Sequence, residues 1–120
     1  MVLLVDDDQD FCDSIRDLLL RRGYAVVTAR DGQQALDTLS VSQAPCVVLL
    51  DLVMPGMDGW GFLTVVKADP QMATIPIVVA SAHSATHAPT GVAGVLQKPF
   101  ALADLFSYVE RYCGPARIGA

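Results

Sequence analysis

An apolar run that ends in a carboxylate and is followed by a loop is the most constraining feature of the sequence. Residues 46–50 read CVVLL, Asp51 follows at once, and residues 54–59 read MPGMDG. A short apolar run bounded by Pro and Gly is typical of a strand buried on both faces of a parallel sheet. We therefore expect Asp51 to lie at the end of a central strand, at the edge of the structure.

The beginning of the chain repeats this pattern. Residues 2–5 read VLLV and run directly into Asp6, Asp7 and Asp8. Two buried strands that both end in acidic residues bring several carboxylates to one edge of a parallel sheet when the two strands are neighbours.

Strand and helix patterns alternate along the chain. The expected strands are residues 2–5, 25–29, 44–50, 77–80 and 95–97. The expected helices run from an N-cap at Asp8 to about residue 22, and over residues 32–39, 60–68 and 102–113. This alternation predicts an α/β fold, a three-layer doubly wound five-stranded parallel sheet in the order 2-1-3-4-5. In that order the first and third strands are adjacent, so Asp6, Asp7 and Asp51 should converge.

Size and charge narrow the functional classes. At 120 residues, 52% of them hydrophobic, the chain should form one domain over residues 1–120, with a frayed tail at residues 114–120. The formal net charge of −5 argues against nucleic-acid binding, and no apolar stretch reaches the ~18 residues of a membrane span. We therefore expect a cytoplasmic protein that binds neither nucleic acid nor a membrane.

The three cysteines, Cys12, Cys46 and Cys113, do not have the spacing of metal ligands. Their odd number favours buried, reduced thiols in a cytosolic protein. A redox role for Cys113, near the end of the chain, is the alternative.

Three carboxylates held close together repel one another, and a hard divalent cation is the simplest source of balancing charge. Asp6 and Asp7 suit a Mg²⁺ site, with Mn²⁺ as an alternative metal. Asp51 would then be free to attack phosphorus and form an acyl phosphate. Lys98 would balance the charge of the phosphoryl oxygens, and Ser81 would donate its hydroxyl to them.

Each of these residues also has a structural interpretation. Asp8 is explained better as a helix N-cap than as a metal ligand. Asp51 could instead form a turn, Ser81 could be an ordinary strand-end hydroxyl, and Lys98 could be a solvated surface charge. The Lys98–Pro99 peptide bond could be cis or trans.

Taken together, four segments resemble the receiver domain of two-component response regulators. They are, in chain order, LLVDDD (3–8), VVLLDLVMPGMDG (47–59), VVASA (78–82) and QKPF (97–100). The resemblance covers essentially the whole chain. It implies a flavodoxin-like fold and a phosphorelay in which a sensor histidine kinase or a phosphotransfer protein phosphorylates Asp51.

The resemblance also implies roles for the other site residues. Asp6, Asp7 and Asp51 would bind Mg²⁺ together with the backbone carbonyl of Val53. Ser81 and Lys98 would take the positions of the switch hydroxyl and the phosphoryl-binding lysine. An effector of unknown identity would bind the face formed by the fourth helix, the fifth strand and the fifth helix.

The sequence departs from the family pattern on that output face. Val95 stands where receivers usually carry an aromatic residue that couples to the switch hydroxyl. The segment between Ser81 and Lys98 is shorter than usual and contains Pro89 and Gly91, so we expect the fourth helix to be short, irregular or absent. These departures suggest an unusual partner or output. His83, close to Ser81, is a hypothetical regulator of acyl-phosphate lifetime, or else a solvated loop residue.

Three other functions are alternatives for such a chain. A phosphatase of the haloacid dehalogenase type would need a second acid where Val53 stands. A flavodoxin would need a hydroxyl-rich phosphate loop where residues 6–8 are all aspartate. The third alternative is a phosphorylation-independent, receiver-like interaction domain. We expect no enzymatic activity beyond the chain's own phosphorylation and dephosphorylation.

Overall fold

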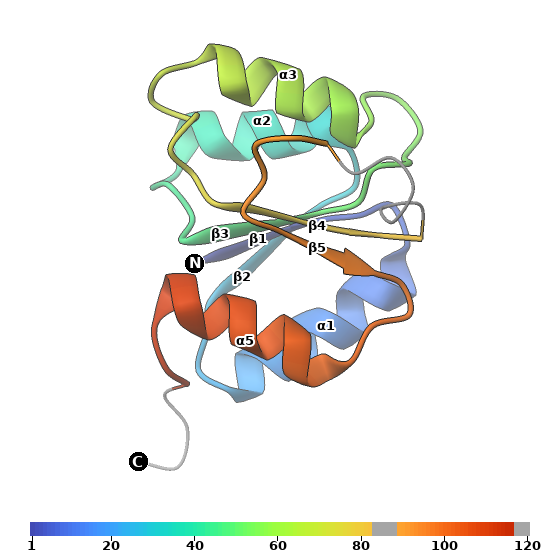
Figure 1. Ribbon diagram of the computed structural model, residues 1–120, viewed down its shortest axis with the longest axis vertical. Coiled ribbons are helices and arrows are strands. Elements are labelled where there is room, and N and C mark those ends of the chain that lie inside the picture. Colours follow the sequence, from blue (N-terminus) through green and yellow to red (C-terminus); the bar gives the residue numbers. More distant parts are fainter. Residues whose placement is uncertain (83–88, 117–120) are drawn as a thin grey trace.

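The computed structural model describes residues 1–82 and 89–116, and a five-stranded parallel sheet runs through its centre (Figure 1). The strands are β1 (Val2–Val5), β2 (Val26–Ala29), β3 (Val47–Leu50), β4 (Ile77–Ser81) and β5 (Gly94–Gln97). Their order is β2-β1-β3-β4-β5, and every neighbouring pair is parallel. The predicted α/β class and strand order are therefore confirmed.

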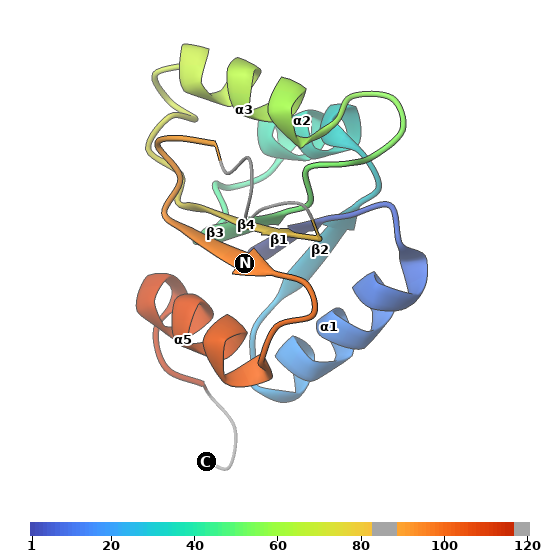
Figure 2. The ribbon, with the colours of Figure 1, turned by 45° about the vertical axis from the view of Figure 1, so that its right-hand side comes forward.

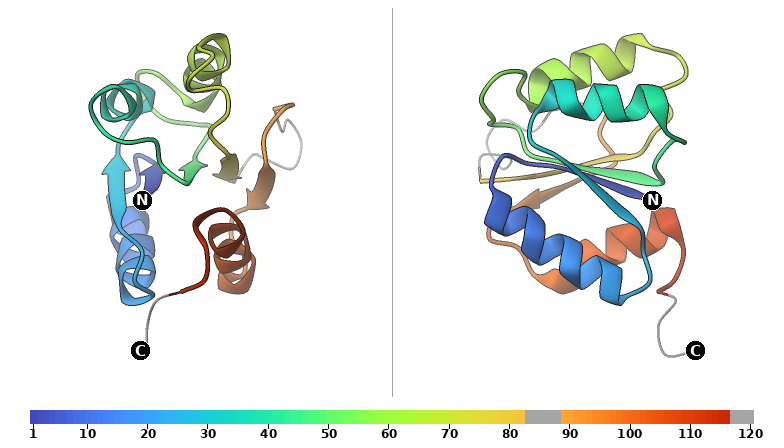
Figure 3. Two further views of the ribbon diagram at one scale, coloured as in Figure 1. Left: turned by 90° about the vertical axis from the view of Figure 1, so that its left-hand side faces the viewer. Right: turned by 180° about the vertical axis from the view of Figure 1, so that it is seen from behind.

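Helices cover both faces of the sheet and complete the three layers. They are α1 (Gln9–Arg21), α2 (Gly32–Val41), α3 (Gly59–Ala68) and α5 (Leu102–Cys113). Helices α1 and α5 lie on one face, and α2 and α3 lie on the other (Figures 1 and 3). The view in Figure 2 shows the same separation from another direction. No described helix is long and apolar enough to cross a lipid bilayer.

The two central strands have no polar face because both of their faces are covered. All residues of β1 and β3 are buried, and alternate side chains enter opposite cores. Leu4 packs with the α1 and α5 side chains, whereas Leu3 packs with those of α2 and α3. This two-sided burial explains the uninterrupted apolar runs in the sequence.

Most predicted element bounds lie within two residues of the observed ones, but β3 begins three residues later than expected. The expected strand included Pro45, which has no N–H group to donate to a strand ladder. The backbone N–H of Cys46 still donates to the carbonyl of Met1 at 2.9 Å, and regular strand structure starts at Val47.

The prediction of three reduced thiols is wrong for two of the cysteines. Cys46 and Cys113 form a disulfide across 67 residues of sequence, while Cys12 is free and buried. The strand order explains the pairing, because it places the residue before β3 beside the last turn of α5. That proximity arises from the tertiary fold and leaves no trace in the local spacing.

The segment between β4 and β5 contains no helix in its described part. Residues 89–93 form a turn in which Gly91 has a positive φ of 76°, and the Lys67 ammonium donates to the carbonyl of Thr90. This agrees with the expectation of a short, irregular or absent fourth helix. His83 lies outside the described residues.

The start of α3 is fixed by a close approach that only glycine allows. A Cβ atom on Gly59 would lie 2.4 Å from the backbone oxygen of Asp51, and a backbone atom has little room to yield. The Gly59 N–H donates to the carbonyl of Leu52 at 3.0 Å, and Asp58 caps the helix by accepting from the N–H of Gly61 at 2.9 Å. This packing holds the loop that follows Asp51 against α3.

We predict that Gly59→Ala lowers the free energy of unfolding by about 1–3 kcal/mol, because the added methyl group must displace backbone. The matched control is Gly61→Ala in the same helical turn, where the new Cβ would meet the flexible Met57 side chain at 3.2 Å. There we expect a change of less than about 1 kcal/mol, since Ala favours the helix. Urea unfolding of both variants tests this difference, and equal losses would contradict it.

Candidate functional site

The register of the central strands brings the acidic residues together. Val5 of β1 is paired with Leu50 of β3, so the next residues, Asp6 and Asp51, leave adjacent strand ends side by side. One carboxylate oxygen from each of Asp6, Asp7 and Asp51 lies within 4.8 Å of the other two. The expected convergence of these three carboxylates is therefore observed.

Asp6 is held on several sides and is almost inaccessible, with 2% of its surface exposed. Its backbone N–H donates to the carbonyl of Ala29 at 3.0 Å, and its Oδ1 accepts from the N–H of Asp8 at 2.9 Å. Its Oδ2 forms an ion pair with the Nζ of Lys98 at 2.6 Å. A buried carboxylate needs such partners, because removing its charge from water is costly without them.

Lys98 reaches this carboxylate from the loop that follows β5. Its backbone N–H donates to the carbonyl of Ser81 at 3.1 Å, which continues the pairing of β4 with β5. Its Nζ also lies 4.0 Å from the ring centroid of Phe11, a cation–π contact. The Lys98–Pro99 peptide bond, which the sequence left undecided, is cis. The interpretation of Lys98 as a solvated surface charge is wrong, since its ammonium is engaged by Asp6.

Asp51 lies at the end of β3 with only 8% of its surface exposed. Burial raises the pKa of its carboxyl group above the ordinary value, and the charge of Asp6 raises it further. A hydrogen bond from Ser81, the charge of Lys98 and the N–H of Leu52 lower this pKa and offset part of the rise. Ser81 itself is fully buried at the end of β4.

Asp8 and Val53 lie at the border of the site. Asp8 is the N-cap of α1, where its Oδ1 accepts from the backbone N–H of Phe11 at 3.1 Å, and it is not a member of the acidic cluster. Its interpretation as a cap is therefore confirmed. Val53 lies two residues beyond Asp51 in the loop before α3, and 57% of its surface is exposed.

The donor set fits a hard divalent cation. Carboxylate oxygens are the preferred ligands of such ions, and two ligands on opposite sides of one ion lie about 4–5 Å apart. The oxygens of Asp6, Asp7 and Asp51 lie within that span of one another. Lys98 balances only one of the three negative charges, so the cluster retains an excess of negative charge that a cation would relieve.

Sequence reasoning missed the aromatic wall beside the site. Phe11, in the first turn of α1, is partly buried and contacts both Lys98 and the edge of Phe100, with the two ring centroids 6.1 Å apart. Together with Ile15 and Leu102 these rings line an apolar pocket of about 480 Å³. The available signal was the position of Phe11, one turn after the acidic residues, which directs its side chain back toward the start of α1.

The raised pKa of Asp51 predicts that Asp51→Asn stabilises the metal-free protein at neutral pH. A carboxyl group whose pKa is higher in the folded state than in the unfolded state favours folding while it is protonated. This contribution is complete at a pH below the unfolded-state pKa of about 3.9. That contribution is lost as the pH rises through the folded pKa, and the amide avoids the loss. When melting temperatures are measured from pH 3 to 8, that of Asp51→Asn should rise above that of the parent chain by a few degrees as the pH increases.

The control for this measurement is Asp37→Asn, which removes an exposed carboxylate on α2. It should follow the parent chain over the whole pH range. Parallel curves for Asp51→Asn and the parent chain would contradict the electrostatic account of the cluster.

Comparison with known protein families agrees with these features. The family model described as response regulator receiver domain matches residues 2–110. The response regulator MprA of Mycolicibacterium vanbaalenii is 34% identical over 111 residues, which cover 88% of this chain and 47% of that protein. The transcriptional regulatory protein PrrA of Mycobacterium tuberculosis is 35% identical over 114 residues, covering 91% and 48%. The chain thus spans about half the length of these curated relatives.

Solved structures show the same likeness. A CheY-like response regulator receiver domain protein from Methanospirillum hungatei superposes with a TM-score of 0.80 at 31% identity, covering 94% of this chain and 93% of that one. The phosphorylated cyanobacterial phytochrome response regulator RcpA gives a TM-score of 0.79 at 29% identity, covering 93% and 92%. Fold, acidic cluster and family model agree, and the chain belongs to the response regulator receiver domain family.

Proposed function

We propose that this chain is the phospho-accepting receiver domain of a two-component phosphorelay, occupying residues 1–120. Asp51 accepts a phosphoryl group from a sensor histidine kinase or a phosphotransfer protein in a Mg²⁺-dependent reaction, and phosphorylation switches the binding of a partner. The observation that carries the proposal is the buried carboxylate of Asp51 between two further acids, a lysine and a serine.

The reaction follows from the position of Asp51. One carboxylate oxygen attacks the phosphorus of a phosphohistidine, a new O–P bond forms, and the P–N bond breaks. The electron pair of that bond leaves with the imidazole nitrogen, which takes up a proton. The raised pKa of Asp51 has a consequence here, because only the ionised carboxylate is the nucleophile, so positive charge nearby favours the reactive form.

Mg²⁺ or Mn²⁺ would be held by the carboxylates of Asp6, Asp7 and Asp51 and by the backbone carbonyl of Val53. When bound, the cation neutralises negative charge on the carboxylates and on the phosphoryl oxygens. Asp6 is shared between this site and Lys98, whose ammonium lies 2.6 Å from it. With this site filled, Lys98 would share Asp6 with the cation, and its ammonium would be freer to contact the phosphoryl group.

Ser81 and Lys98 would respond to phosphorylation together. A phosphoryl group adds about two negative charges, which attract the lysine and accept a hydrogen bond from the serine hydroxyl. Both residues belong to the paired ends of β4 and β5, where the Lys98 N–H donates to the carbonyl of Ser81. A shift of the two side chains would thus bias the conformation of this sheet edge.

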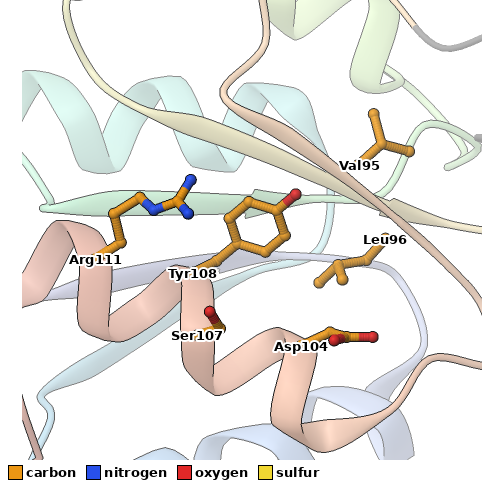
Figure 4. Close-up of a pocket in the computed structure, with 6 residues that line it drawn as sticks. All are labelled: Val95, Leu96, Asp104, Ser107, Tyr108 and Arg111. Carbon is orange, nitrogen blue, oxygen red and sulfur yellow. The ribbon is translucent and has the colours of Figure 1, made fainter.

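The effector would bind the face formed by β5, α5 and the segment between β4 and β5, where the fourth helix lies in other receivers. Figure 4 shows Tyr108 reaching from α5 toward β5, with Arg111 beside it and Val95 pointing away from α5. The Tyr108 ring packs over Gly94 so closely that a Cβ there would lie 2.3 Å from it. With Val95 in the usual aromatic position, Tyr108 supplies an aromatic side chain on this face.

The alternative is a receiver-like interaction domain that works without phosphorylation. Val95 and the helix-free turn at residues 89–93 favour it, since both depart from the family's switching face. The presence of Asp51, Lys98 and Ser81 in one buried cluster favours the phosphorylated switch.

Incubation with acetyl phosphate and Mg²⁺ separates these two functions. We expect the intact mass to rise by one phosphoryl group, with the modification on Asp51 and none on Asp51→Asn. Asp37→Asn is the control that keeps the cluster and should be phosphorylated like the parent chain. Omission of the metal, or Asp7→Asn, should slow the reaction strongly. No mass gain under any condition would support the phosphorylation-independent domain.

Substitution of Lys98 tests its competition with the cation. Lys98→Gln leaves the buried Asp6 without its charged partner and should cost about 1–3 kcal/mol of stability in the metal-free protein. Because no ammonium competes for Asp6 in this variant, added Mg²⁺ should stabilise it more than it stabilises the parent chain. A saturated site contributes about 2.7 kcal/mol at 100 times Kd. Thermal unfolding with and without Mg²⁺ measures both effects. The control is the exposed Lys67→Gln, and an equal Mg²⁺ response in all three chains would contradict the competition.

A further inference from the structure

We propose that Cys46 and Cys113 form a reversible thiol–disulfide site, at which oxidation fastens the end of α5 to the sheet. The site lies outside the acidic cluster, and the proposal does not depend on phosphorylation. Disulfides in reducing compartments are usually transient and redox-sensing, which makes a reversible bond the functional form there.

The fold brings the two cysteines to bonding distance without distortion of the elements that carry them. Cys46 directly precedes β3, and Cys113 is the last residue of α5. Their Cα atoms are 5.2 Å apart, inside the range of about 4.4–6.8 Å found for disulfides. The backbone N–H groups of Cys46 and Gly114 donate to the carbonyls of Met1 and Glu110 whether or not the sulfur atoms are bonded to each other. The Cys46 Sγ also lies 3.2 Å from the Met1 carbonyl oxygen, which can accept from the thiol of the dithiol form.

The pair is accessible, whereas the third cysteine is not. Cys46 and Cys113 are only partly buried, and with Tyr24 and Tyr112 they line a pocket of about 300 Å³. This pocket offers a small thiol or disulfide a path to the pair. Cys12 is only 2% exposed and lies in the core between α1 and the sheet, so a small disulfide cannot reach its thiol.

Besides the disulfide, core packing and two polar contacts hold the end of α5 in place. Val109, one turn before the end of the helix, is fully buried in the core between α5 and the sheet. The hydroxyl of Tyr24 donates to the carbonyl of Gly114 at 2.7 Å, and Arg22 lies 3.9 Å from Glu110 in a largely exposed ion pair. Exposed pairs of this kind contribute little stability. The disulfide closes a loop across 67 residues, so its formation should change the stability of this end considerably.

The disulfide and the acidic cluster lie at opposite ends of β3. Cys46 precedes the strand and Asp51 follows it, a separation of about 16 Å along an extended chain. Figure 1 shows the end of α5 beside the N-terminus, away from the other end of the sheet, where α1 begins. Oxidation should therefore act on α5 and leave the chemistry at Asp51 unchanged.

The reaction uses a low-molecular-weight disulfide, such as oxidised glutathione, as the oxidant. A thiolate of the pair attacks it, one glutathione thiol leaves, and a mixed disulfide forms. The second cysteine then displaces the other glutathione thiol and closes the internal bond. The protein loses two electrons and two protons, and oxidised glutathione becomes two thiols. A dithiol reductant reverses the sequence.

Equilibration of the full chain in glutathione buffers of increasing oxidised fraction tests the proposal. The samples are quenched with acid, unfolded, alkylated and weighed by mass spectrometry. We expect the number of alkylated cysteines to fall from three to one, the remaining one being Cys12, and to return to three with dithiothreitol. The oxidised form should melt about 10 °C or more above the reduced form. Both forms should react with acetyl phosphate at the same rate, or both should fail to react if the proposed function is wrong.

Two variants complete the design. Cys12→Ala should keep the redox-dependent shift in melting temperature, and Cys113→Ser should lose it while melting like the reduced parent chain. Three alkylated cysteines in every buffer would overturn the proposal. So would glutathione adducts or linked dimers in place of the internal bond, a bond that excess dithiothreitol cannot reduce in the folded protein, or identical melting of the two forms.

Discussion

The parallel pairing of β1 with β3 is the constraint on which the rest of the structure depends. It aligns Val5 with Leu50, so that the residues after them leave the sheet at the same edge. The apolar side chains of both strands are buried on both faces, which secures the register, because a shift would pull apolar groups out of two cores. The acidic cluster is thus a consequence of how the core packs. The hydrophobic energy of the two central strands holds together three carboxylates that repel one another.

That repulsion is the functional property of the site. Asp6 and Asp51 are buried, and Lys98 supplies one positive charge for the cluster. The acidic cluster is therefore compatible with a divalent cation, whose positive charge would offset the repulsion among the carboxylates. Lys98 occupies the centre of this arrangement, with Asp6 on one side and the ring of Phe11 on the other. The position of its ammonium should consequently report the charge state of the cluster.

Much of the fold was predictable because its signals are local. The apolar runs at residues 2–5 and 47–50, the cap at Asp8 and the Pro/Gly loop after Asp51 each specify their own conformation, and a general rule for parallel sheets then sets the strand order. Two features depend on contacts between distant residues and were not predictable, namely the disulfide between Cys46 and Cys113 and the ion pair of Asp6 with Lys98. The start of β3 at Val47 could have been predicted, because Pro45 cannot donate a hydrogen bond within the expected strand.

The central claim is that the edge shared by β1 and β3 holds a divalent cation beside Asp51. Crystals of the chain grown with Mn²⁺, with diffraction data collected at the manganese absorption edge, test it most directly. The account predicts an anomalous peak at about 2.0–2.3 Å from carboxylate oxygens of Asp6, Asp7 or Asp51, with the Lys98 ammonium moved away from Asp6. A saturating concentration of Mn²⁺ that gives no peak at this edge, and leaves the ion pair of Asp6 with Lys98 in place, would contradict it.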